Sequence, residues 1–247
     1  YISPKYGRFY RLWALRSLHR SRTPIWGMGE IAVNQYRKEF GEDRSYVNLP
    51  YFSNLQRFEI EAVKRTPTQE GPRVILYSGS LIYRKGVDLL AKAFARLVGS
   101  GDAENVRLRI MGRGELESSM RKQLATCMTK VDFVGFKDWN ELPAEYGRAH
   151  LLCAPSRHDG WGLIVPEGLA AGLPVISTAS TGAAIDLIKP GNNGWLVPAN
   201  DEEGLLSALR QSASLPTKVM NQMSINASAS VSDHTLAKGA RRFLDAA

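Results

Sequence analysis

The sequence predicts an α/β protein whose main unit is a doubly wound parallel sheet. Apolar runs of strand length alternate with longer segments of helical periodicity over most of the chain, and glycine-containing loops separate them. The 247 residues are 44% hydrophobic, which suffices for one large core or for one domain and part of another. No apolar run approaches the ~18 residues of a membrane span.

Residues 1–65 are predicted to be the end of a first domain together with a linker. The expected elements are strands at 23–28 and 46–49 and a helix at 30–40. Residues 59–72 are polar and contain Pro67, Gly71 and Pro72, so this stretch is interpreted as a linker.

Residues 66–235 are predicted to form the doubly wound domain. The expected strands are 73–78, 106–111, 131–134, 151–155, 173–177 and 195–197. The expected helices are 88–98, 115–128, 142–147, one that follows the loop near residue 160, and 202–211. A last helix is expected over 236–247.

The net charge of +8 suits an anionic ligand, an acidic membrane surface or nucleic acid, although ordinary solvated charge explains most of it. No RRM, KH or zinc-finger pattern is present, so nucleic acid is not an expected partner. Cys127 and Cys153 form neither a disulfide framework nor a metal cluster, which favours the cytoplasm. Because the first residue is Tyr1 rather than Met, we expect a fragment of a longer chain.

Residues 1–22 carry arginines and a histidine among apolar residues at roughly helical spacing. Two interpretations are open. The segment is a surface helix in peripheral contact with anionic lipid on the inner face of a membrane, or a packed domain helix with a basic outer face. We favour the second.

The central stretch is 156–176, SRHDGWGLIVPEGLAAGLPVI, which carries two carboxylates eight positions apart, Asp159 and Glu167. A glycine-rich loop lies between two predicted strands and leads into a helix. Ligands of open α/β sheets bind at the carboxyl ends of strands and at helix N-termini, where Asp159, Gly160 and Gly162 fall. Free N–H groups there favour an anionic or hydroxyl-rich ligand.

A second loop, 77–86, follows the first strand of this domain and precedes a helix, which is where doubly wound folds bind phosphate. It lacks the glycine fingerprints of dinucleotide binders and P-loops. It carries Arg84 and Lys85 instead, followed by Gly86. An arginine fork beside a lysine charge is suited to a diphosphate.

The central stretch resembles the acidic-x7-acidic element of retaining GT-B glycosyltransferases of family four, the glycosyl transferases group 1. Asp159 stands where that family usually has Glu, and Trp161 stands where it usually has Phe. The residues that match are Gly162, Leu163, Glu167, Gly172, Pro174 and Val175.

The second loop resembles the family's diphosphate loop, usually Gly-Arg-Leu followed by Lys-Gly. The matching residues are Gly79, Leu81, Lys85 and Gly86. Ser80 replaces the usual Arg, and we infer from proximity that Arg84 takes its role. Residues 133–136 match a segment that borders the nucleotide base. Asp186 stands where the family has Glu.

The resemblance implies a retaining hexosyltransferase that moves a sugar from a UDP- or GDP-sugar to a glycan or lipid-linked glycan, with no cofactor and no required metal. It implies that this chain holds the donor, that the last helix packs toward the first domain, and that the fragment alone is inactive. The expected catalytic residues are Asp159, Arg84 and Lys85. The expected donor-binding residues are Gly79, Ser80, Gly160, Trp161, Gly162, Leu163, Glu167 and Phe136.

Within this resemblance, Asp159 would accept hydrogen bonds from sugar hydroxyls and Glu167 from the ribose. Other functions stay open. The chain is alternatively a nucleotide-sugar-binding module without transfer activity, or part of a GT-B nucleotide-sugar epimerase or phosphorylase. An NAD-binding domain is disfavoured because the glycine fingerprint is missing.

Overall fold

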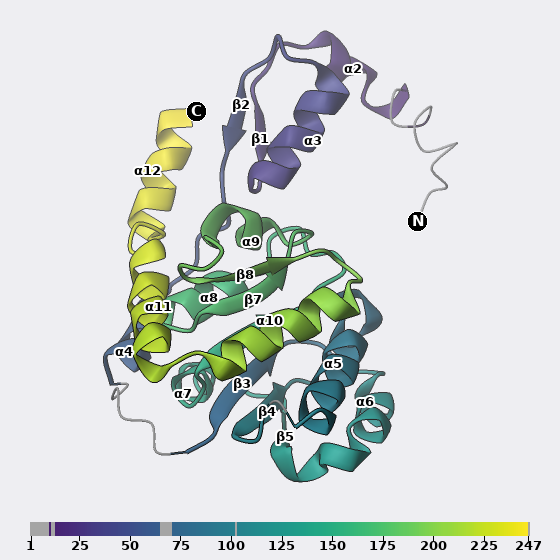
Figure 1. The fold of residues 1–247 in the computed structure, drawn as a ribbon. Coiled ribbons are helices and arrows are strands. Elements are labelled where there is room, and N and C mark those ends of the chain that lie inside the picture. Colours follow the sequence, from purple (N-terminus) through teal and green to yellow (C-terminus); the bar gives the residue numbers. More distant parts are fainter. Residues whose placement is uncertain (1–9, 11–12, 65–70, 102, 247) are drawn as a thin grey trace.

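The computed structural model describes residues 10, 13–64, 71–101 and 103–246, and its main unit is a six-stranded parallel sheet between two layers of helices (Figure 1). The strand order is β5-β4-β3-β6-β7-β8. The strands are β3 Arg73–Ser78, β4 Val106–Met111, β5 Val131–Gly135, β6 Leu151–Ala154, β7 Val175–Thr178 and β8 Gly194–Val197. The predicted α/β doubly wound class is confirmed.

Both faces of the sheet are covered, and every residue of the central strands β6 and β7 is buried. Along β3, Ile75 and Tyr77 point into one core and Leu76 into the other, as the two-residue period of a strand requires. The first core lies under α5 Val87–Gly99 and α10 Glu202–Ser214. The second lies under α8 Ile164–Ala170 and its neighbours.

The remaining helices of this unit complete the two layers. They are η1 Tyr83–Lys85, α6 Glu117–Gln123, η2 Ala125–Lys130, α7 Leu142–Gly147, α9 Gly182–Leu187 and α11 Thr217–Ser230. The single helix predicted over 115–128 is wrong, because α6 and η2 are separate and Cys127 has non-helical angles. Thr and Cys have low helix propensity, which favours a break there. The helices α9 and α11 were missed, since α11 is polar and weakly periodic.

The predicted linker at 59–72 is also wrong over its first part. Helix α4 Gln56–Lys64 occupies it and contacts α7 and α8. Phe58 is fully buried and lies edge-on to Tyr146, with ring centroids 5.0 Å apart. Because most side chains of α4 are charged or polar, its sequence resembles that of a linker. The helix is held in place by Phe58, whose burial against Tyr146 is visible only in the tertiary structure. Residues 65–70 lie outside the described residues.

The N-terminal unit consists of α2 Arg16–Arg20 and the parallel pair β1 Ile25–Gly27 and β2 Tyr46–Asn48, with α3 Glu30–Phe40 between them. No residue of α2 is buried. Residues 1–9 and 11–12, on which much of the predicted basic helix falls, lie outside the described residues.

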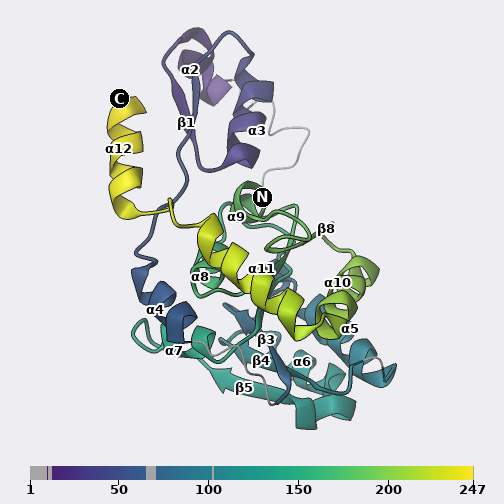
Figure 2. The ribbon, with the colours of Figure 1, turned by 60° about the vertical axis from the view of Figure 1, so that its left-hand side comes forward.

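Helix α12 Leu236–Ala246 runs beside this N-terminal unit in both views (Figures 1 and 2). The rings of Trp26 and Phe243 meet edge to face at 4.9 Å, and Phe52 packs against Gly239. This is the expected packing of the last helix toward the first unit. The boundaries 1–65, 66–235 and 236–247 stay predictions. Every helix in the described part of the chain is too short or too polar to cross a bilayer.

Candidate functional site

The two predicted loops converge at the carboxyl ends of β3 and β6, which are neighbours in the sheet. Lys85 Nζ donates to Asp159 Oδ2 and forms an ion pair with it. Beside this pair, Arg84 Nη1 donates to the carbonyl oxygen of His158 at 3.0 Å, while the Arg84 side chain stays exposed. The structure therefore brings together the three residues expected to be catalytic.

The second loop is held close to the strand ends by glycine. Gly86 has φ of 68°, a left-handed conformation that side chains disfavour, and a Cβ there would collide with the Pro155 carbonyl oxygen. A Cβ on Gly112, after β4, would likewise collide with the carbonyl oxygen of Gly79. The loops after β3, β4 and β6 thus meet backbone to backbone.

The loop that carries Asp159 is fixed by main-chain hydrogen bonds to the segment after β7. The Asp159 N–H donates to Ser180 O at 3.0 Å, and the Gly182 N–H donates to Asp159 O at 3.1 Å. Gly162 has φ of 86°, and a Cβ there would lie 2.6 Å from Thr181 Cγ2. At Gly160, by contrast, an added Cβ would meet nothing within 4 Å.

Trp161 is buried, and its ring takes part in packing rather than lining the loop. The ring stacks on His234 at 5.9 Å with an interplanar angle of 13°, and a Cβ on Gly29 would lie 3.0 Å from it. Because the ring is buried, any contact of residue 161 with a sugar donor must come from its backbone. Leu163 directly precedes α8.

Glu167 lies in the first turn of α8 and is only 6% exposed. Burial raises the pKa of this carboxyl to about 7, against the lowering effects of the Tyr146 hydrogen bond and the Arg57 charge. The Tyr146 hydroxyl donates to Glu167 Oε2 at 3.0 Å and also bonds to the Ser78 side chain. Asp159 and Glu167 thus have different partners, one in a loop and one in the core.

A cavity of about 400 Å³ lies at the carboxyl ends of β3, β4 and β5. It is lined by Ser78, Gly79, Ser80, Met111, Gly112, Arg113, Phe136, Lys137, Trp139 and Leu142. Gly79, Ser80 and Phe136, all predicted donor-binding residues, are among them. Phe136 and Trp139 expose large aromatic surfaces there.

The residues at the site that were not found from the sequence include Arg113, Lys137, Trp139 and Tyr146. Arg113 stands between Gly112 and Gly114 in the turn after β4, and a cation in a glycine turn at a strand end was the signal that could have found it. Tyr146 carried no signal, because a tyrosine in a short apolar helix is ordinary core.

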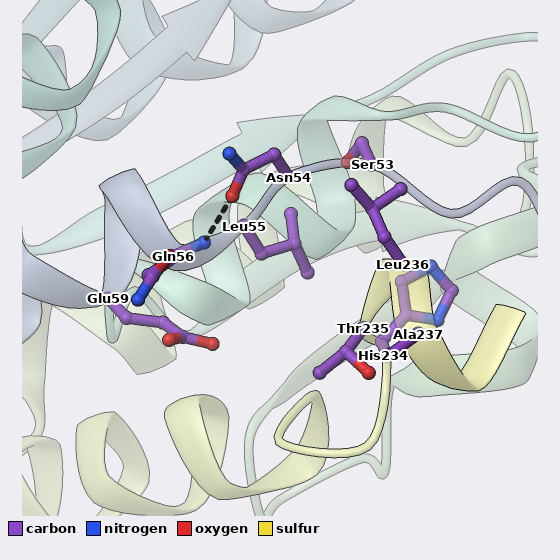
Figure 3. A pocket seen from close by; sticks show the side chains of 9 residues that line it. All are labelled: Ser53, Asn54, Leu55, Gln56, Glu59, His234, Thr235, Leu236 and Ala237. Carbon is purple, nitrogen blue, oxygen red and sulfur yellow. Dashed lines mark hydrogen bonds between the residues drawn. The ribbon is translucent and has the colours of Figure 1, made fainter. Parts of the chain in front are cut away.

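Two further cavities of about 390 Å³ each lie away from these strand ends. Figure 3 shows one of them, between the segment that enters α4 and the segment that enters α12, with Glu59 and His234 on opposite sides. The other is lined by basic residues of α12. Neither contains a predicted site residue. Among the described residues, no three His, Cys, Asp or Glu side chains cluster as a metal site.

The six-stranded parallel sheet with helices on both faces has a Rossmann-like architecture, and the solved structures that superpose on it have the GT-B fold. The HepE protein of Anabaena in complex with UDP superposes with a TM-score of 0.81 at 15% identity, over 99% of this chain and 69% of that one. A sucrose-phosphate synthase of Thermosynechococcus elongatus superposes with 0.74 at 21% identity, over 96% and 60%.

Residues 59–230 match the family model for glycosyl transferases group 1, and the chain belongs to this family. It is 31% identical over 209 residues to an N-acetyl-D-galactosaminyltransferase of Campylobacter jejuni, over 85% of this chain and 54% of that one. It is 24% identical over 196 residues to a GDP-mannose-dependent mannosyltransferase of Corynebacterium glutamicum, over 74% and 50%. The predicted membership of the glycosyl transferases group 1 is confirmed.

The chain spans only part of the curated relatives that it matches, from 34% to 54% of their length. The activity of the whole protein, its substrates and its partners are therefore proposals.

Proposed function

We propose that the whole protein is a retaining hexosyltransferase that transfers a sugar from a UDP- or GDP-sugar to a glycan or lipid-linked glycan. This chain binds the donor. The observation that carries the proposal is the Lys85–Asp159 ion pair, which joins a cationic loop to an acidic one at the carboxyl edge of the sheet. The family membership supports it.

The diphosphate binds at Arg84 and Lys85. The Arg84 guanidinium is exposed beside the ion pair, and Gly86 leads directly into the N-terminus of α5. The two cations and the positive end of a 13-residue helix offset the charge that develops on the leaving diphosphate. This supply of positive charge is the reason we propose that no metal and no cofactor is needed.

The sugar lies against Asp159 and the backbone of residues 160–163. Asp159 accepts hydrogen bonds from sugar hydroxyls while Lys85 holds its other side. The open space around Gly160 leaves room for the sugar ring. The positive end of α8, which begins at Ile164, also faces this region.

The base and ribose bind along the cavity at β3, β4 and β5. Phe136 and Trp139 offer aromatic faces to the base. Glu167 accepts from the ribose hydroxyls. Tyr146, which donates to Glu167 and is hydrogen-bonded to the Ser78 side chain, links this carboxyl to the cavity wall. Ionised Glu167 is the stronger acceptor, so its pKa of about 7 makes this contact dependent on pH.

We expect the protein to lie in the cytoplasm, on the inner face of a membrane if its acceptor is lipid-linked. The basic N-terminal segment and the two free cysteines support this location. Because the chain spans about half or less of its relatives, we expect it to bind donor but to transfer little sugar alone.

Isothermal titration of the chain with UDP, GDP and ADP, and then with the corresponding sugars, tests the proposal. One of the diphosphates should bind in the presence of a chelator, and its sugar should bind at the same site. Binding that appears only with added magnesium would contradict metal independence. Absence of binding by all three, with and without magnesium, would contradict the donor site itself. Transfer by the full-length protein then separates a transferase from a binding module.

A further inference from the structure

Arg157 lies two residues before Asp159 and makes an unusually complete set of contacts. Its Nη1 and Nη2 donate to the two carboxylate oxygens of Asp88 at 2.6 and 2.8 Å. Nη1 also donates to the Tyr83 carbonyl oxygen at 2.6 Å, and Nε donates to Asn200 Oδ1 at 2.6 Å. The guanidinium carbon lies 3.7 Å from the centroid of the Tyr83 ring.

These contacts leave Arg157 little capacity to bind a ligand. A guanidinium has five N–H donors, and the four hydrogen bonds engage the donors of all three nitrogens. The Arg157 and Asp88 side chains are only 11% and 18% exposed. Arg157 therefore differs from Arg84, whose side chain is exposed at the site.

The contacts of Arg157 tie together three segments that are distant in sequence. The first is η1, through the Tyr83 carbonyl and through the Arg157 N–H, which donates to Arg84 O at 2.9 Å. The second is the first turn of α5, through Asp88. The third is the turn after β8, where Asn200 has φ of 62°.

Asp88 is well suited to hold Arg157 in place. Burial by itself would raise the pKa of Asp88, but the hydrogen bonds and charge of Arg157 lower it overall, so the carboxylate stays ionised. Its position in the first turn of α5 adds the favourable field of the helix N-terminus. A bidentate pair of this kind fixes orientation as well as distance.

We propose that Arg157 is a positioning residue, which holds the Arg84–Lys85 segment at the distance from Asp159 that the donor diphosphate requires. This inference rests on the proposed donor site. The Lys85–Asp159 pair is a single contact between two side chains, and the Arg84 side chain that bonds to the His158 carbonyl oxygen is exposed. Residue 157 instead makes several contacts, with Asp88 and with the Tyr83 and Arg84 carbonyl oxygens, and these hold the backbone that carries Arg84 and Lys85.

The test uses Arg157→Lys, which keeps the charge but loses the planar fork, and Asp88→Asn, which removes the charged partner. The control is Arg96→Lys on the same helix, about 12 Å along α5 from Asp88 at 1.5 Å per residue. Arg96 also forms an arginine–carboxylate pair, with Glu202 and Glu203, but on the surface. Each protein is titrated with UDP, GDP and ADP and with the matching nucleosides.

We expect Arg157→Lys and Asp88→Asn to raise the Kd of the nucleoside diphosphate roughly tenfold. This is the effect of losing one charged hydrogen bond of about 1.5 kcal/mol between the diphosphate and the displaced Arg84–Lys85 segment. The Kd of the nucleoside should change less than about twofold, since its contacts lie elsewhere. Arg96→Lys should change neither value. A merely structural role would weaken both ligands together, so equal losses would overturn the inference.

Hydrogen exchange gives a second readout that needs no ligand. The Lys85 N–H donates to Ile82 O and the Gly86 N–H to Tyr83 O, each at 3.0 Å, so both amides report on η1. We expect their exchange to accelerate in Arg157→Lys and Asp88→Asn and not in Arg96→Lys. Unchanged exchange in both variants would overturn the inference, whether or not the wild type binds a nucleotide. Absence of nucleotide binding by the wild type would refute the donor site, which is a separate conclusion. If Arg157→Lys does not fold, Asp88→Asn decides the same question.

Discussion

Lys85 and Asp159, which are 74 residues apart in sequence, form an ion pair between the loops after β3 and β6. Their side chains are only 16% and 14% exposed, so solvent screens this pair less than a surface salt bridge. Each residue therefore sets the electrostatic environment of the other. A diphosphate that approaches Lys85 competes with Asp159, and a sugar that approaches Asp159 competes with Lys85.

Replacing Lys85 should harm diphosphate binding by two routes. Lys85→Ala removes a cation and leaves Asp159 without its partner, next to the incoming negative charge. We expect the loss in binding free energy to reach about 3 kcal/mol for the nucleoside diphosphate, the upper range for a charged hydrogen bond. The nucleoside should bind almost as before. Titration calorimetry with both ligands checks this, and equal losses for the two would contradict a diphosphate role for Lys85.

Replacing Asp159 should have the opposite effect on the bare diphosphate. Asp159→Asn removes a competing anion and frees Lys85, so we expect the nucleoside diphosphate to bind more tightly, by about 1 kcal/mol or less. In the full-length enzyme the same change should lower kcat, because a carboxylate near the reacting sugar matters most in the transition state. Loss of diphosphate binding in Asp159→Asn would reverse the assigned roles of Asp159 and Glu167.

The raised pKa of Glu167 makes stability depend on pH. Burial lifts this pKa from 4.5 to about 7, so between these values the folded chain holds a proton that the unfolded chain has lost. The contribution of Glu167 to stability is thus fully present below pH 4.5 and is lost as pH rises through 7. The shift corresponds to a loss on the order of 3 kcal/mol.

Glu167→Gln removes this titration. The free energy of unfolding is measured with denaturant at several pH values. We expect the difference between variant and wild type to shift in favour of the variant by about 3 kcal/mol between pH 4.5 and 8. The control is Glu203→Gln, because Glu203 is exposed and its hydrogen bond to Arg96 lowers its pKa. If the free energies of unfolding of Glu167→Gln and wild type change in parallel with pH, the pKa of Glu167 is not raised in the folded chain.

Two glycines with similar backbone angles separate conformational strain from close packing. Gly86 and Gly101 have φ of 68° and 75°, but only a Cβ on Gly86 would collide, with the Pro155 carbonyl oxygen. Gly101→Ala should cost about 1–2 kcal/mol of stability, the penalty of the left-handed conformation. Gly86→Ala should cost about 3 kcal/mol or more, because the backbone must also move. Equal losses on denaturant unfolding would show that the loop is not held against β6.

Much of the architecture followed from local patterns. The alternation of apolar runs and periodic segments predicted the parallel sheet, and the bounds of α3, β3, β4 and α7 agree with expectation. Hydrophobic periodicity did not predict the helices in which only a few residues are buried. Helix α4 presents mainly Phe58 to the core, and α11 is polar enough to pass for a loop. In both cases tertiary packing outweighs intrinsic propensity.

The sequence by itself determined the fold class, and it predicted a site at the carboxyl edge of the sheet and the residue types gathered there. Only the tertiary structure decided which charges meet. Lys85 pairs with Asp159 because β3 and β6 are neighbours in the sheet, although two strands lie between them in sequence. Arg157 meets Asp88 for the same reason, since Arg157 follows β6 and Asp88 lies on the helix after β3. Glu167 meets Tyr146 because the helices before and after β6 pack near each other. The hydrophobic periodicity of a segment determines which of its faces is buried. Which side chains meet depends on the order of the strands in the sheet, and the crossover connections set that order.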